Sequence, residues 1–166
     1  MNRLSFQTVI TWSLSAALSA FSVGCEEGDI TPQPSEHTHI EIEGTWGNED
    51  FGQTDVIDDT TWSTDFGKGP TVSEIVEFSN AERYAVRRSP DDAEYLPGTY
   101  DYTVWTAPEG DSFYVCTASY GCETPELAAT GDDDDENKVC DPPMPDETDL
   151  DGKGCGGFSW TKLTKL

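Results

Sequence analysis

Basic residues are scarce in this chain. Its 166 residues include 9 Lys and Arg against 33 Asp and Glu, which gives a formal net charge of −24. A surface of this sign repels phosphate backbones and anionic lipid headgroups. Nucleic-acid binding and charge-driven attachment to a membrane surface are therefore disfavoured.

The residue types from which active sites are commonly built are also few. The chain has two histidines, His37 and His39, and neither has a plausible nucleophile partner in the sequence. No glycine-rich motif that would cradle a phosphate is present. We therefore predict that the protein is not an enzyme, with no catalytic residues and no cofactor.

A long uncharged run occurs once. Residues 4–24 carry no charge and follow a weakly positive start, a pattern typical of a secretory signal peptide. Gly24 directly before Cys25 resembles the bacterial lipoprotein signal, in which the cysteine is acylated. Two alternatives stay open. One is a retained spanning helix, which the polar residues of the run disfavour, and the other is ordinary cleavage after Ser19 or Ser22.

The number of cysteines bears on this choice. An odd number, five, would leave an unpaired thiol, which is unusual in an exported protein. If Cys25 carries a lipid, four cysteines remain for two disulfides in an oxidising compartment: Cys116, Cys122, Cys140 and Cys155. We therefore predict a lipoprotein signal over 1–24 and acylation of Cys25.

The segment after the predicted anchor is polar and acidic. Residues 25–38 contain acids, a glycine and two prolines with almost nothing apolar, and they predict a flexible tether. Glu26 is not the Asp that signals retention in the inner membrane, so the outer membrane is favoured. The predicted location is the bacterial cell envelope, and the predicted membrane contact is the lipid anchor.

Residues 39–166 are predicted to form a single all-β domain. Apolar and polar residues alternate over 40–46 and 99–105, as in half-buried strands. Further strands are expected at 53–57, 60–64, 72–78, 82–88, 113–119 and 156–163, one short helix at 124–130, and a disordered acidic loop at 131–154. About eight short strands predict a small antiparallel β-barrel or a sandwich. The barrel is preferred because pairing the last strand with the first removes both exposed edges.

Four stretches of this domain resemble a family of uncharacterised bacterial lipoproteins. They are Ile42-Glu43-Gly44-Thr45-Trp46, Thr60-Thr61-Trp62, Tyr114-Val115-Cys116 and Cys155-Gly156-Gly157-Phe158-Ser159-Trp160-Thr161-Lys162-Leu163. The resemblance covers most of 40–166 in order and implies export and architecture, but no activity. Gly44-Thr45-Trp46 at an opening strand also resembles the lipocalin signature.

The same resemblance implies a disulfide pairing. Simpler members of the lipoprotein family carry one cysteine at each of the positions of Cys116 and Cys155, so we pair these two. Cys122 is then left to pair with Cys140. From the residues alone, three connectivities of the four cysteines remain open.

Two groups of residues are candidates for binding metal ions. His37 and His39 would face the same way on a strand, with Glu41 as a third ligand for a transition metal, although solvated histidines are the favoured interpretation. The 147–152 stretch resembles the start of a calcium loop and offers Glu147, Asp149 and Asp151 as weak calcium ligands. Phe158 stands where a bidentate Glu would belong, so a complete EF-hand is excluded. A metal site is not predicted.

Aromatic residues suggest a last candidate. They could line a pocket for an apolar ligand inside the barrel, although filling a small solid core is the favoured role; the candidates are Trp46, Trp62, Tyr100, Tyr102 and Trp160. The main hypothesis is a structural or interaction module displayed on the envelope. The alternatives are a lipocalin-like carrier of a small hydrophobic ligand and a calcium-responsive surface module. The identity of a protein or ligand partner stays open.

Overall fold

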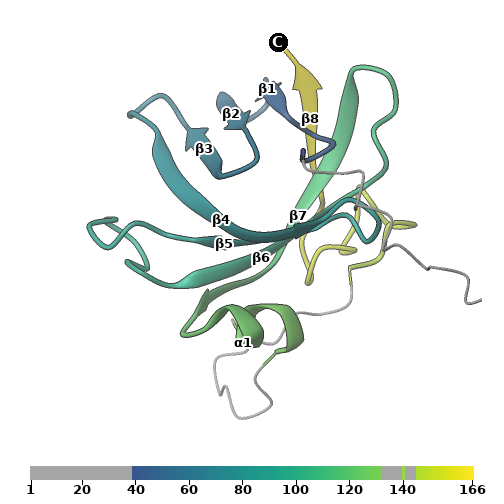
Figure 1. Ribbon diagram of the computed structural model, residues 1–166. Helices are drawn as coiled ribbons and strands as arrows, with labels where there is room; N and C mark the ends of the chain where they lie inside the picture. The colour runs from purple at the N-terminus through teal and green to yellow at the C-terminus, as the bar shows by residue number, and fades with distance from the viewer. Residues whose placement is uncertain (1–38, 132–139, 141–144) are drawn as a thin grey trace, which may run out of the picture. The chain divides into compact units, whose positions relative to one another are not determined.

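The computed structural model describes residues 39–131, 140 and 145–166, and within them the chain forms a closed antiparallel barrel of eight strands. Each strand pairs with the next along the chain, and β8 pairs with β1 to close the wall (Figure 1). The strands are β1 Gly44–Asn48, β2 Gln53–Ile57, β3 Thr61–Asp65, β4 Thr71–Ser79, β5 Tyr84–Arg88, β6 Tyr100–Trp105, β7 Ser112–Cys122 and β8 Thr161–Lys165. The predicted all-β barrel is confirmed, and the sandwich is excluded. The predicted signal, tether and Cys25 lie outside the described residues.

Alternation along the strands divides their side chains between the interior and the outer wall. The interior is packed with large apolar groups toward the end that holds the β2–β3, β4–β5 and β6–β7 turns, which we call the closed end. The cluster consists of Ile40, Ile42, Trp46, Ile57, Trp62, Ile75, Ala85, Trp105, Phe113, Val115 and Leu163. Within it, Trp46 meets Phe113 edge-on, with ring centroids 4.6 Å apart.

The first strand begins later than the alternation over 40–46 predicts. Residues 39–43, which we call the lead-in segment, form a turn, with the Glu43 N–H donating to the Ile40 carbonyl at 3.1 Å. Ile40 and Ile42 are nevertheless buried, because the segment closes one end of the core cluster. The indole of Trp46 donates to the Ile42 carbonyl at 2.8 Å and fixes the turn to β1. Every second residue of this stretch is buried, as predicted, but the backbone forms a turn and not a strand.

The last strand is also shifted from its expected position. A strand was expected over 156–163, whereas β8 begins at Thr161. Gly156 and Gly157 have φ angles of 60° and 95°, and the Cys155 N–H donates to the Phe158 carbonyl at 2.8 Å. Such left-handed residues make a tight turn rather than an extended strand. The remaining strands begin and end within three residues of their expected bounds.

The short helix α1, Pro125–Thr130, matches the predicted range. The Thr124 hydroxyl accepts from the Leu127 N–H at 3.2 Å as an N-cap, and proline opens the first turn. The helix lies outside the barrel beside β6 and β7 (Figure 1). It covers a second apolar cluster in which Ala128 packs with Cys122 and Cys140.

Both predicted disulfides are present, and they are nested in the sequence. Cys116–Cys155, the outer disulfide, joins β7 to the turn before β8 across a separation of 39 residues. Cys122–Cys140, the inner disulfide, spans 18 residues within it. The two bridges tie the excursion between β7 and β8 to the barrel wall.

Part of the predicted acidic loop is folded. Residues 145–154 form a compact turn in which the Asp146 N–H donates to the Gly154 carbonyl at 2.7 Å. Leu150 packs against the cluster of Trp160 and the outer disulfide, and the Trp160 N–H donates to the Leu150 carbonyl at 2.9 Å. One apolar side chain therefore docks an otherwise acidic stretch. Residues 132–139 and 141–144 of the loop lie outside the described residues.

Candidate functional site

The end of the barrel opposite the closed end is polar and hollow, and we call it the open end. A cavity of about 400 Å³ there is bordered mainly by polar interior residues, among them Asp55, Trp62, Thr64, Arg87 and Thr117. A second hollow of about 600 Å³ shares Thr64 and Arg87 with it and extends along the β5–β6 loop. An eight-stranded barrel is wide enough either to pack solid or to hold one small ligand. This barrel is packed in one half and open in the other.

A fully buried carboxylate lies at the base of the cavity. Asp55 has an exposed fraction of 0%. It accepts hydrogen bonds from Gln53 Nε2 at 2.5 Å, Trp62 Nε1 at 3.0 Å and Thr64 Oγ1 at 2.5 Å. A buried carboxylate persists only when such donors replace its water. The bond from Nε1 also ties the Trp62 ring to Asp55 in the cavity wall.

Arg87 lies above this ring, and its guanidinium is only partly paired. The Cζ atom is 4.8 Å from the centroid of Trp62, a cation–π arrangement. Nη2 is 3.5 Å from Asp101 Oδ2 and donates to Thr117 Oγ1 at 3.4 Å, while Nε is buried without a hydrogen-bond partner among the described residues. The side chain is 11% exposed. Nε itself is out of reach of solvent, so a ligand in the cavity could meet only the more exposed part of the guanidinium.

Burial perturbs the titration of both partners in this ion pair. It lowers the pKa of Arg87, an effect that the nearby carboxylates of Asp101 and Asp55 oppose. Burial raises the pKa of Asp101, against the opposing influence of Arg87 and of the Gly121 N–H. In each group burial is the largest cause of the shift, and the charge of the partner opposes it.

Exposed aromatic side chains surround the open end. Phe66 and Phe158 border the first cavity, and Phe66, Tyr95 and Tyr120 border the second. Their exposed fractions run from 40% for Tyr120 to 75% for Tyr95. We call these four residues the aromatic rim. Exposed apolar groups gathered around a cavity are a candidate binding surface.

The structure does not bring the five predicted pocket residues together. Trp62 alone borders the open-end cavity, and Trp46 is packed in the closed-end core. Tyr100 and Tyr102 pack beside the helix cluster, and Trp160 covers the outer disulfide. The polar centre, formed by Asp55, Arg87 and Asp101, was not predicted. The sequence signal for it was side-chain alternation. Asp55 is two residues from the inward-facing Ile57 and Arg87 two residues from the inward-facing Ala85, so each charge lies on the inner face of its strand.

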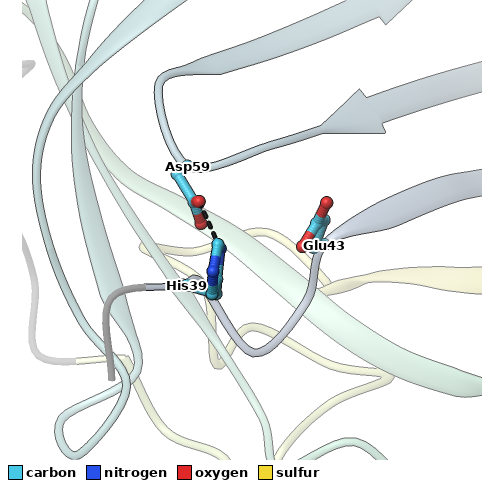
Figure 2. A group of neighbouring side chains, drawn as sticks. All are labelled: His39, Glu43 and Asp59. Carbon is cyan, nitrogen blue, oxygen red and sulfur yellow. Dashed lines mark hydrogen bonds and ion pairs between the residues drawn. The ribbon is translucent and has the colours of Figure 1, made fainter. Parts of the chain in front are cut away.

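A second group of side chains gathers beside the lead-in segment. Figure 2 shows His39 and Glu43 of that segment near Asp59 of the β2–β3 turn. His39 Nδ1 is 2.5 Å from Asp59 Oδ2, and one donor atom of each residue lies within 4.8 Å of the others. Glu41, the third ligand predicted from the sequence, instead accepts from the Trp105 indole at 2.7 Å. The other histidine, His37, lies outside the described residues.

The candidate calcium ligands do not form such a cluster. Glu147, Asp149 and Asp151 are exposed in the 145–154 turn, and no group of three metal-binding side chains includes them within the described residues. Asp149 Oδ2 accepts from the Lys153 N–H at 2.8 Å, so part of its carboxylate serves the turn itself.

No protein-family model, curated protein or solved structure matches this chain. The resemblances to a lipoprotein family and to lipocalins therefore stay predictions. Across 39–131, 140 and 145–166, the structure contains no helix with the length and hydropathy that a membrane span requires.

Proposed function

We propose that the protein is a lipid-anchored carrier, or binding module, for a small apolar molecule that bears a hydrogen-bond acceptor. Among the functions predicted from the sequence, this is the one that the geometry favours. The observation that carries it is the half-filled barrel: a cavity of about 400 Å³ with an incompletely paired Arg87 inside and aromatic side chains at its edge. Concave sites of this size with a few polar groups are typical of small-molecule binding.

The aromatic rim and the polar interior of the cavity together define the class of ligand. The aromatic rim offers apolar contact, so the ligand presents a ring system or a short hydrocarbon body there. Deeper in, the Arg87 guanidinium borders the cavity, and its N–H groups are the donors that a carboxylate, sulfonate or carbonyl oxygen would meet. Asp55 is engaged by three donors of the protein and serves as support for Trp62 rather than as a ligand contact.

Two fluorescent dyes with one aromatic frame test this division. 1-Anilinonaphthalene-8-sulfonate carries an anionic sulfonate, whereas N-phenyl-1-naphthylamine lacks it. Both are expected to bind with increased fluorescence, and the sulfonate is expected to bind about tenfold more tightly, the equivalent of one hydrogen bond to a charged group. Arg87→Met is expected to abolish this preference and to leave binding of the neutral dye in place.

Neighbouring residues supply matched controls. Arg88→Met removes the same charge one residue away, from a side chain that pairs with Asp91 and does not border the cavity. It is expected to leave the preference unchanged. Phe158→Ala, at a side chain 73% exposed, is expected to weaken both dyes, whereas Phe51→Ala, which removes a ring 66% exposed that does not border the cavity, is not. Equal effects within either pair of variants would refute the site, provided that near-UV circular dichroism shows native packing.

The anchor is supported by the sequence over 1–25 and is tested separately. Intact mass before and after reduction reports both the acyl chains on Cys25 and the two disulfides. An unmodified Cys25 would refute the anchor and leave the binding site as it stands, because the cavity is built from residues of the barrel.

A further inference from the structure

The cluster of His39, Glu43 and Asp59 at the closed end has the composition of a metal site. It combines an imidazole nitrogen with two carboxylates, drawn from two segments of the chain (Figure 2). It does not border the open-end cavity, and the proposed ligand-binding function does not use it. One ligand atom from each residue lies within 4.8 Å of the other two, and His39 Nδ1 is 2.5 Å from Asp59 Oδ2.

The backbone beneath these side chains is firmly held. Asn80 Nδ2 donates to the His39 carbonyl at 2.8 Å, and the Glu41 N–H donates to Asn80 Oδ1 at 2.9 Å. Ile40, between them, is buried in the core. The lead-in segment is thus fixed on both sides of the imidazole, while the His39 side chain itself is 72% exposed. Exposure gives an ion free entry and leaves room for water as a further ligand.

The turn that carries Asp59 is fixed as well. Asp58 Oδ1 accepts the N–H groups of Thr60 and Thr61 at 2.8 and 2.7 Å and so closes the β2–β3 turn. Asp59 Oδ1 accepts the Ile40 N–H at 2.8 Å, which turns its second oxygen toward His39. A hydrogen bond to the outer oxygen of a ligating carboxylate is a common way to orient such a ligand.

We propose that His39, Glu43 and Asp59 bind a divalent transition-metal ion of the zinc class. Tetrahedral ligands about 2.0–2.2 Å from zinc lie roughly 3.4 Å apart; His39 Nδ1 and Asp59 Oδ2 are closer than that, at 2.5 Å, and no pair of ligand atoms in the cluster is more than 4.8 Å apart. Rotation of exposed side chains is therefore enough to assemble the site. The ion would replace the His39–Asp59 contact and offset two neighbouring carboxylates. Calcium and magnesium prefer oxygen ligands alone, so the imidazole favours zinc over both.

Binding would tie the lead-in segment to the β2–β3 turn. Three protein ligands leave at least one coordination position for water, as in open zinc sites. Because the ion binds only the assembled cluster, it stabilises the folded barrel.

The test uses the full chain, stripped with a chelator and held in millimolar magnesium so that the other acidic side chains are occupied. Co²⁺ is expected to bind at one equivalent with a visible ligand-field spectrum, and Zn²⁺ is expected to displace it. His39→Gln, Glu43→Gln and Asp59→Asn are each expected to weaken Zn²⁺ binding at least about tenfold. Glu123→Gln, which removes an exposed carboxylate outside the cluster, is expected to bind like the wild type.

Thermal unfolding supplies a second measurement for the same proteins. Zn²⁺ is expected to raise the midpoint of the wild type and of Glu123→Gln, and to leave that of His39→Gln unchanged. Midpoints without metal show whether each variant is folded. Wild-type affinity in His39→Gln would overturn the proposal, since the ion would then be bound by the acidic surface alone. Absence of a Co²⁺ spectrum in the wild type would overturn it as well.

Discussion

Replacing Asp55 with asparagine removes a buried negative charge without changing the volume of the side chain. In the wild type the carboxylate accepts three hydrogen bonds, from Gln53, Trp62 and Thr64. The single amide oxygen of asparagine accepts at most two of them, and its NH₂ group faces a donor. Asp55→Asn therefore tests how strongly the polar base of the cavity contributes to the fold.

The expected cost follows from these contacts. Leaving one buried donor unpaired costs about 1–3 kcal/mol, and changing the other two bonds from a charged to a neutral acceptor costs about 1 kcal/mol each. Relief of carboxylate desolvation offsets part of the loss. We expect the free energy of unfolding to fall by about 3 kcal/mol, a large share of the 5–15 kcal/mol typical of a domain.

Urea unfolding with both disulfides intact measures this change. Asp50→Asn, at an exposed aspartate in the β1–β2 loop, is the control and is expected to stay within about 0.5 kcal/mol of the wild type. Thr64→Val is expected to cost less in the Asp55→Asn background than in the wild type, because its donor has already lost a charged acceptor. A cost below about 1 kcal/mol for Asp55→Asn would refute the reasoning, since the carboxylate would then contribute little net stability.

Three further predictions concern the outer disulfide and two titrating groups. Alanine at both Cys116 and Cys155 is expected to lower the free energy of unfolding by about 3 kcal/mol. The outer disulfide spans 39 residues and the inner one 18 of these, so with the inner disulfide closed the outer one constrains a loop of 39 − 18 = 21 residues. An unchanged urea midpoint would contradict this. Hydrogen bonds from the β2–β3 turn lower the pKa of Asp58 from 3.8 to about 2, so its contribution is present above pH 3.8 and is lost as the pH falls toward 2. Asp58→Ala is therefore expected to be less stable near neutral pH, with a difference from the wild type that narrows in acid; a pH-independent difference in thermal midpoints would exclude this linkage. Burial raises the pKa of Asp101, so its carboxylate gains a proton early as the pH falls and leaves Arg87 less paired. The preference for the sulfonate dye is expected to grow as the pH falls through that pKa. Asp101→Asn is expected to show the increased preference at every pH. A preference that does not change with pH in the wild type would contradict the role given to Asp101 as the partner of Arg87.

The barrel was predictable because its determinants are local. Alternation and turn residues are each read from a few neighbouring residues. Closure of the barrel then follows from the need to pair the two edge strands. The two errors in strand position have one cause. Over 40–43 and 156–160, residues that alternate like a strand sit in turns instead, in the second case because Gly156 and Gly157 adopt left-handed angles. In the first stretch alternation reported burial without fixing the backbone, and in the second it reported neither, since Phe158 is 73% exposed.

The candidate site was harder to predict because aromatic type is a poor guide to position. Trp62 borders the cavity, but other predicted aromatic residues pack on the outside of the barrel wall. Tyr100 and Tyr102 pack against the cluster under the helix, and Trp160 packs against the outer disulfide. What distinguishes the cavity is an inward-facing charge. Arg87 is such a charge, and its signal in the sequence is its position two residues after Ala85, on the same face of β5.

The division of the barrel into an apolar and a polar half explains how one small domain can be both stable and open. Apolar side chains packed at the closed end supply the buried apolar area that folding requires, so the open half does not need to be packed with apolar groups. Charges in the open half are tolerated because each is held by the wall: Asp55 by three donors, and Arg87 by Trp62 and Asp101. A barrel packed solid throughout would leave Arg87 no position with access to a ligand. Arg87 therefore lies in the wall of the cavity that the proposed binding function requires.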